Sequence, residues 1–185
     1  MYSKYGSIKK ARGIFDRVKD KDLTIWTSMI NSYAIHGMAD EAINLFEKMT
    51  TSEGLKPDTI VYTSLLLACG HSGLIEDVLK YFKSMQTNFG ISSTIEHYTC
   101  LVDLLGRVGQ LELALVTIQA MSLELQARAW GSLLSACRIH GNVELGELAA
   151  AKLLELSPGS SGSYVLMANL YTSVKSLTRQ IKCDT

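Results

Sequence analysis

Apolar side chains recur along this chain with the spacing of one face of an α-helix. The clearest run falls at i, i+3, i+4 and i+7, at Trp26, Met29, Ile30 and Tyr33. A second run follows Gly37 with a similar spacing, at Ala42, Leu45, Phe46 and Met49. Glycine permits the tight turn between the two runs. The pattern therefore predicts a helical hairpin that ends before the turn residues Gly54 and Pro57.

This hairpin pattern repeats along the chain. Aromatic residues stand 36, 36, 32 and 34 positions apart, at Trp26, Tyr62, Tyr98, Trp130 and Tyr164. Glycines follow the first four aromatics at +11, at Gly37, Gly73, Gly109 and Gly141, and Gly6 extends this series toward the start. Small or slim residues lie five positions after each glycine, and apolar residues lie twelve positions after it. One hairpin cannot bury its own apolar face, so neighbours must stack. The sequence therefore predicts an all-α, right-handed α-solenoid of helix-turn-helix repeats with a concave groove.

Composition excludes several classes of protein. The 185 residues are 47% hydrophobic, which excludes a disordered tail, and the 2 prolines disfavour a loop-rich or all-β fold. No apolar run approaches ~18 residues, so we expect no membrane span. The 4 cysteines have no CxxC spacing, and we expect reduced, mostly buried thiols.

The intervals between the repeated glycines vary in an ordered way, at 31, 36, 36 and 32 residues. Varying lengths in this order indicate several repeat types in a fixed sequence. The segments read MYSKYGSIKKARGIFDRVKDKD, WTSMINSYAIHGMADEAINLFEKM, TSLLLACGHSGLIEDVLKYFKSM, HYTCLVDLLGRVGQLELAL, WGSLLSACRIHGNVELGELAAAKLLEL and SYVLMANLYTS. Together these strings resemble the pentatricopeptide repeat (PPR) family of plants, in the class that alternates P, L and S repeats and ends in E motifs.

The resemblance divides the chain into six segments. Residues 1–22 resemble part of an S-type repeat, 23–58 a P-type repeat, 59–94 an L-type repeat and 95–126 an S-type repeat. Residues 127–160 resemble a first E motif, and 161–185 a truncated second E motif with a divergent tail. Lys175 stands where the glycine at +11 from Tyr164 is expected, and we expect the last ~10 residues to be poorly ordered. The start inside a repeat's first helix suggests that an upstream array is missing.

Members of this family bind single-stranded organellar RNA, one base per repeat. By resemblance, each base is read by the residue after the aromatic and by the last residue of the repeat. The candidate pairs are Thr27 with Asp58, Thr63 with Thr94, and Thr99 with Gln126. The family combines a hydroxyl and a carboxylate for a purine, usually guanine, and this rule fits the first pair. Ile60 would clamp a base from its side or pack in the core.

A purely structural interpretation of these residues stays open beside the RNA-reading one. A threonine in the first turn can simply form a hydrogen bond within that turn, and Asp58 after Pro57 is typical of an N-cap.

The distribution of charge along the chain also affects the expected affinity for RNA. Residues 1–22 hold 7 basic against 3 acidic side chains, whereas residues 23–174 hold 8 against 14. Because an acidic body attracts phosphate poorly, we expect weak RNA affinity for this chain alone.

We expect no catalytic residue, metal or cofactor in this chain. Plant proteins of this class often carry a deaminase domain with H-x-E and C-x-x-C signatures, and neither signature occurs here. Cys137 and His140 have a ligand-like spacing, but one pair cannot close a tetrahedral zinc site. A packed thiol and a turn histidine are the favoured interpretation.

The leading functional hypothesis is a non-catalytic C-to-U RNA-editing specificity factor in a mitochondrion or chloroplast. By resemblance, its partners would be single-stranded organellar RNA, multiple organellar RNA editing factors, and a deaminase-bearing PPR protein that acts in trans. The alternatives are a protein-interaction solenoid similar to a tetratricopeptide scaffold, and a truncated product without an independent function.

Overall fold

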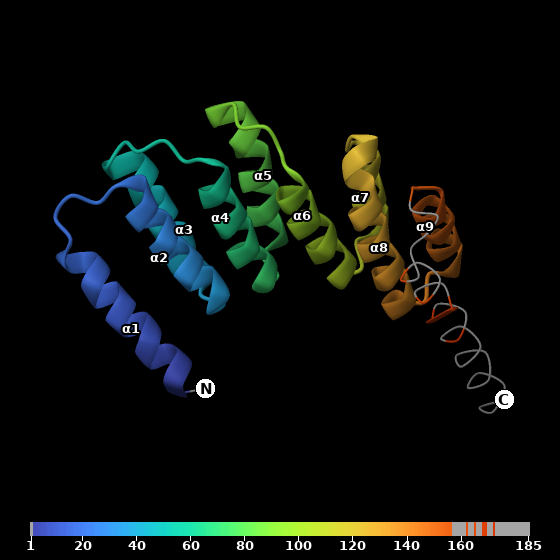
Figure 1. The fold of residues 1–185 in the computed structure, drawn as a ribbon, viewed down its shortest axis with the longest axis horizontal. Helices are drawn as coiled ribbons and strands as arrows, with labels where there is room; N and C mark the ends of the chain where they lie inside the picture. Colours follow the sequence, from blue (N-terminus) through green and yellow to red (C-terminus); the bar gives the residue numbers. More distant parts are fainter. Residues whose placement is uncertain (1, 157–161, 163–164, 166–167, 170–171, 173–185) are drawn as a thin grey trace. The chain divides into compact units, whose positions relative to one another are not determined.

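The computed structural model describes residues 2–156, 162, 165, 168–169 and 172, and the regular structure within them is helical (Figure 1). The chain divides into two compact units, residues 1–100 and residues 101–185. The division falls inside one helix, α6 (Ile95–Arg107). Within the described residues, no helix combines the length and the apolar content that a membrane crossing requires.

The first unit is a series of packed helices. It contains α1 (Tyr2–Arg17), α2 (Leu23–Ile35), α3 (Ala39–Glu47), a π-helical turn η1 (Lys48–Ser52), α4 (Thr59–His71), α5 (Ile75–Phe89) and the start of α6. Helices α2 and α3 form one hairpin, and α4 and α5 form the next. The first helices of the two hairpins, α2 and α4, also pack against each other (Figure 1). The candidate site lies at this contact.

Both hairpins begin at an aspartate and turn at a glycine. Oδ1 of Asp22 accepts the N–H of Ile25 at 2.9 Å, and Oδ1 of Asp58 accepts the N–H of Val61 at 2.9 Å. Each carboxylate thereby bonds one of the N–H groups that have no partner at a helix start. The turn glycines have a left-handed backbone, with φ 69° at Gly37 and 73° at Gly73. The predicted turns are confirmed here, and glycine suits them because a Cβ is strained at such angles.

The repeated aromatic column forms the core of the first unit. Trp26 and Tyr62 are buried, and each meets a phenylalanine edge-on. Phe15 lies 5.0 Å from Trp26 and Phe46 lies 5.3 Å from Tyr62, between ring centroids. The methionines predicted twelve positions after Gly37 and Gly73 are buried as well. The residue that follows each aromatic therefore lies at the border between the core and the outer face.

The second unit continues the pattern with the rest of α6, α7 (Leu111–Gln119), α8 (Leu123–His140) and α9 (Val143–Leu156). Helix α8 packs against both α7 and α9. The backbone is left-handed at Gly109 (φ 78°) and at Gly141 (φ 69°), as predicted. A Cβ at Gly106 would come within 2.7 Å of the Cβ of Ala136, so α6 and α8 approach closely at this point.

One predicted turn was wrong, and one expected repeat boundary lies within a helix. Gly6 lies inside the continuous helix α1 and not at a turn, because glycine permits a turn without requiring one. The boundary expected between residues 126 and 127 falls inside α8, which begins at Leu123 after the extended backbone of Ser122. Most of the expected second E motif, with its tail and Tyr164, lies outside the described residues.

Candidate nucleic-acid interface

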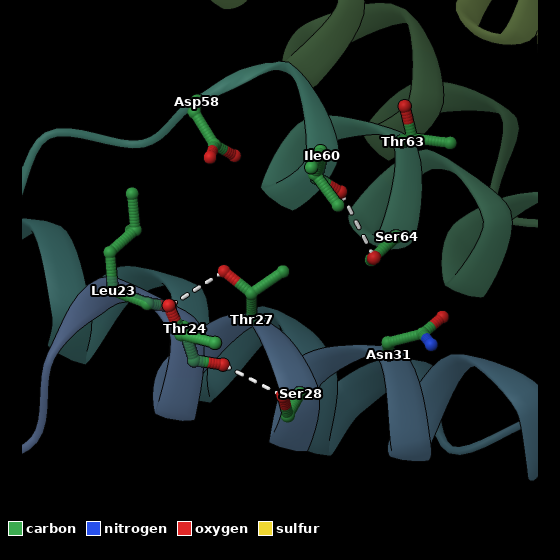
Figure 2. A pocket seen from close by; sticks show the side chains of 9 residues that line it. All are labelled: Leu23, Thr24, Thr27, Ser28, Asn31, Asp58, Ile60, Thr63 and Ser64. Carbon is green, nitrogen blue, oxygen red and sulfur yellow. Dashed lines mark hydrogen bonds between the residues drawn. The ribbon is translucent and has the colours of Figure 1, made fainter.

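An open cavity of about 470 Å³ lies between α2 and α4 in the first unit. It is lined from α2 by Leu23, Thr24, Thr27, Ser28 and Asn31, and from the start of α4 by Asp58, Ile60, Thr63 and Ser64 (Figure 2). Four of these nine lining residues were predicted from the sequence as RNA contacts, although they come from two different repeats. Among the lining residues, Asp58 alone carries a charge.

The two carboxylate oxygens of Asp58 have different surroundings. Oδ1 caps α4 through the N–H of Val61. Within the described residues, Oδ2 has no hydrogen-bond partner, and the carboxylate points into the space between α2 and α4 (Figure 2). Both interpretations of Asp58 therefore fit one side chain: it is an N-cap, and it presents an acceptor oxygen to the cavity.

The Thr27 hydroxyl faces the same space from α2 (Figure 2). It donates its proton to the carbonyl oxygen of Leu23 at 2.6 Å. A hydroxyl has one proton and two lone pairs, so Thr27 is left with acceptor capacity toward the cavity. Thr27 and Asp58 therefore present acceptors only. Their chemistry suits the N–H donors on the edge of a nucleobase.

The side chain of Ile60 is 64% exposed beside this pair, so the alternative that it packs in the core was wrong. Its sequence neighbour Val61 takes the buried position on α4 instead. Asn31 also lines the cavity and was not among the residues predicted from the sequence. Its position four residues after Thr27 on the same helix face is the signal that could have identified it.

The pair of the third repeat (residues 59–94), Thr63 and Thr94, is called the third pair below, and it has a different environment because His97 lies between the two residues. The side chain of His97 is 0% exposed. Its Nδ1 accepts the backbone N–H of Thr94 at 3.0 Å and lies 3.2 Å from Oγ1 of Thr94. Its Nε2 lies 3.0 Å from the carbonyl oxygen of Thr59 and 3.1 Å from Oγ1 of Thr63. One imidazole therefore contacts both members of the predicted pair.

These partners define the protonation state of His97. Nδ1 accepts an N–H, so it carries no proton, and Nε2 must donate because a carbonyl oxygen can only accept. The Thr63 hydroxyl donates its own proton to Thr59 at 2.9 Å, and so it accepts from Nε2. Burial lowers the pKa of His97, an effect that the nearby Glu96 carboxylate and the Thr59 carbonyl partly oppose. The ring is therefore held neutral.

The residues of the pair in the fourth repeat, Thr99 and Gln126, lie in different units, and each is bonded within its own unit. The Thr99 hydroxyl donates to the carbonyl oxygen of Ile95 at 2.7 Å. The Gln126 amide donates to the carbonyl oxygen of Met121 at 2.9 Å and accepts the indole N–H of Trp130 at 3.2 Å. Gln126 therefore lies inside α8, and its amide is bonded to Trp130 of that helix and to Met121 just before it. Asp58, by contrast, lies at the start of α4.

Cys137 and His140 have separate structural surroundings. Cys137 is buried, and burial raises the pKa of its thiol to about 11. Nε2 of His140 lies 2.8 Å from the carbonyl oxygen of Gly106, so its ring joins α8 to α6. In the part of the chain that the structure describes, no group of three His, Cys, Asp or Glu residues could hold a metal ion.

Family models and solved structures agree on the class of protein. Models of the PPR repeat match residues 21–71, 60–88 and 96–123, and a model of the E motif matches residues 140–178. The structure of PPR10 from maize matches with a TM-score of 0.66 at 19% identity, over 94% of this chain and 25% of that chain. PPR10 in complex with an 18-nt psaJ RNA element matches with a TM-score of 0.61 at 17% identity, over 89% and 27%. The fold is thus that of an α-solenoid built from helical hairpins.

Two relatives in Arabidopsis thaliana identify the family of this chain. A pentatricopeptide repeat-containing protein named as mitochondrial is 52% identical over 173 residues, which cover 94% of this chain and 24% of that protein. CRR2, named as chloroplastic, is 43% identical over 175 residues, which cover 95% and 26%. This chain belongs to the pentatricopeptide repeat family, and it spans about a quarter of the length of these relatives.

Proposed function

We propose that this chain binds single-stranded RNA and that one base enters the cavity between α2 and α4. The observation that carries this proposal is the convergence of Thr27, Asp58 and Ile60 on one open cavity. Repeats of this family read one base each with two or three side chains. PPR10, which has a similar fold, has been solved in complex with an 18-nt RNA element, and this supports the same class of ligand.

The chemistry of the cavity favours a base with neighbouring N–H donors. Thr27 and Asp58 offer acceptors, and the free oxygen of Asp58 would make a charge-assisted hydrogen bond, which is stronger than a neutral one. The exposed Ile60 side chain would pack against the face of the base. Guanine has two adjacent donors, an imino N–H and an amino group. We therefore assign guanine as the preferred base at this repeat.

Asp58→Asn tests the proposal, because an amide of the same shape can still cap α4 but has lost the charge. We expect the preference for guanine over the other bases at one nucleotide to fall by about tenfold, the value of one charge-assisted hydrogen bond. Fluorescence anisotropy with short labelled RNAs that vary at one position measures this preference.

Asp22→Asn is the matched control for this experiment. Asp22 caps α2 with the same 2.9 Å bond but does not line the cavity. We expect RNA selectivity to be unchanged in this variant. Equal loss in both variants, or no loss in Asp58→Asn, would contradict the proposed reading role.

For the whole protein, we propose a non-catalytic specificity factor for C-to-U editing of organellar RNA, with a deaminase supplied by a partner. The E motif at residues 140–178 supports this role by family analogy, and relatives named as mitochondrial or chloroplastic support an organelle. Sequencing of organellar transcripts after loss of the gene tests it. An unedited cytidine that regains editing with the wild-type gene is the expected result, and an unchanged set of edited sites would contradict the role.

Protein binding is the second candidate function. A groove of about 240 Å³ in the second unit is lined by residues of α7, α8 and α9, including Leu123, which is 71% exposed, and Leu148. Exposed apolar side chains beside a groove suit a protein contact. Leu123→Ser with Leu148→Ser should abolish partner capture and leave RNA binding intact. Loss of RNA binding alone would count against this second function.

A further inference from the structure

The pairs of the second and third repeats differ at one buried position, which lies in the helix that begins directly after each pair. In α6 this position is His97, and in α4 it is Val61, each immediately before the aromatic of its repeat. Val61 has no polar side-chain atom, so its only bond to the pair is the N–H that Asp58 caps. His97 places two ring nitrogens at this position, and both of them are hydrogen-bonded to residues of the neighbouring pair.

We propose that His97 is a specificity-determining residue that silences the third pair by binding the hydroxyl of Thr63 and the backbone N–H of Thr94. This inference rests on the proposed function, in which each pair reads one base.

The occupied groups can be followed atom by atom. The Thr63 hydroxyl donates its proton to Thr59 and accepts from Nε2 of His97. The Thr94 hydroxyl donates to Oε2 of Glu96 at 2.7 Å, and its backbone N–H is bonded to Nδ1 of His97. A hydrogen bond that replaces an existing one adds little net free energy. What this pair still offers to a base is neutral hydroxyl lone pairs, whereas the charged free oxygen of Asp58 is available at the second repeat.

The proposal predicts what happens when a carboxylate is introduced at the third pair. In Thr94→Asp the new carboxylate would lie close to Nδ1 of His97, because Oγ1 of Thr94 is already 3.2 Å from that atom. A carboxylate at this distance favours the protonated imidazole. Nδ1 would then give up the N–H of residue 94 that it accepts in the wild type and donate to the carboxylate in an internal ion pair. The carboxylate is then captured by His97, and the third pair stays silent.

Removal of the imidazole should release this carboxylate. The double variant Thr94→Asp with His97→Val copies the combination of Asp58 and Val61 in α4, where the carboxylate caps the helix through one oxygen. A second version, Thr94→Asp with His97→Ile, copies Asp22 and Ile25 in α2. The two versions keep the test available if one of them folds poorly. The expected gain appears in the double variants and not in Thr94→Asp alone.

The test uses the 185-residue chain and labelled RNAs that vary at two adjacent positions. The nucleotide read by the second repeat is the one whose preference changes in Asp58→Asn, and the neighbouring nucleotides report on the third pair. We expect the wild type and Thr94→Asp to discriminate less than about twofold there, and the double variants to prefer guanine by about tenfold. Equal discrimination by Thr94→Asp and the double variants, or strong discrimination by the wild type, would overturn the inference.

A second readout separates this inference from the proposed function. NMR of the imidazole should show a neutral ring with the proton on Nε2 in the wild type at neutral pH, and a protonated ring in Thr94→Asp. A ring that stays neutral in Thr94→Asp would refute the capture step. If no variant discriminates at either nucleotide, the proposed function fails, and the NMR result alone then decides whether His97 captures the side chain at position 94.

Discussion

The candidate pairs of the second and third repeats occupy the same positions in the repeat, yet their surroundings differ. Beside Thr27 and Asp58 lies an open cavity, and one carboxylate oxygen has no partner within the described residues. Between Thr63 and Thr94 lies the buried ring of His97, which bonds to both. A residue in a candidate reading position can therefore offer a ligand only the hydrogen-bonding capacity that its neighbours leave unused.

The largest expected effect is on the core residue directly before Thr63. Tyr62 is fully buried and contacts Phe46 edge-on. Tyr62→Ala should lower the free energy of unfolding by about 3–5 kcal/mol, through lost burial and a residual cavity. Urea unfolding followed by circular dichroism measures this change.

Tyr62→Phe provides the control for this substitution. It removes only the hydroxyl contact with Ser84, at 3.1 Å, and should cost about 1 kcal/mol. If Tyr62→Ala cost no more than Tyr62→Phe, burial of the aromatic ring would not stabilise the first unit.

The second effect separates the capping role of Asp58 from its proposed reading role. Asp58→Ala should cost about 1 kcal/mol of stability because the N–H of Val61 loses its cap. Asp58→Asn should cost less, since an amide oxygen also caps, although it removes the charge needed for the base. Thermal unfolding of both variants checks this order. A large stability loss in Asp58→Asn would show that the charge is needed for folding as well.

A third effect depends on pH and belongs to the third pair. Burial places the pKa of His97 in the folded chain below its ordinary value of about 6.5 in the unfolded chain. Near this pH the folded state therefore binds fewer protons than the unfolded state. The stability that neutral His97 contributes is complete above about pH 6.5 and declines as the pH falls below it toward the lower pKa of the folded chain.

Urea unfolding between pH 8 and pH 5 measures this effect. His97→Val is the control, and the wild type should lose more stability on acidification than this variant does. Because other groups titrate in both proteins, the difference between the two curves isolates His97. Parallel curves would show that protonation of the ring is not coupled to folding.

The smallest expected effect on stability is at Ile60. This side chain is exposed, so Ile60→Ser should change the free energy of unfolding by no more than about 0.5 kcal/mol. RNA affinity should nevertheless fall, because the base loses an apolar contact. Val61→Ser at the neighbouring buried position should instead destabilise the chain by about 1–3 kcal/mol. Similar stability losses in the two variants would contradict the outward position of Ile60.

The sequence by itself determined the repeating frame of this protein. Residues three or four apart share a helix face, so the spacing of Trp26, Met29 and Ile30 was enough to predict a buried face on α2. The turn glycines and the N-cap aspartates likewise act within a few residues, through a left-handed backbone or a bond to the third residue on. Such local rules apply wherever the residues occur.

Only the tertiary structure decided which candidate side chains are available to a ligand. His97 contacts Thr63 and Thr59, which lie 34 and 38 residues away in the sequence, and no local pattern shows that contact. The exposure of Ile60 and the cavity shared by Thr27 and Asp58 likewise depend on how α2 packs against α4. A donor or acceptor that is bonded to a neighbouring side chain is no longer available to a ligand. The sequence therefore named the pairs, and the packing of successive helices determined which pair keeps an unused acceptor.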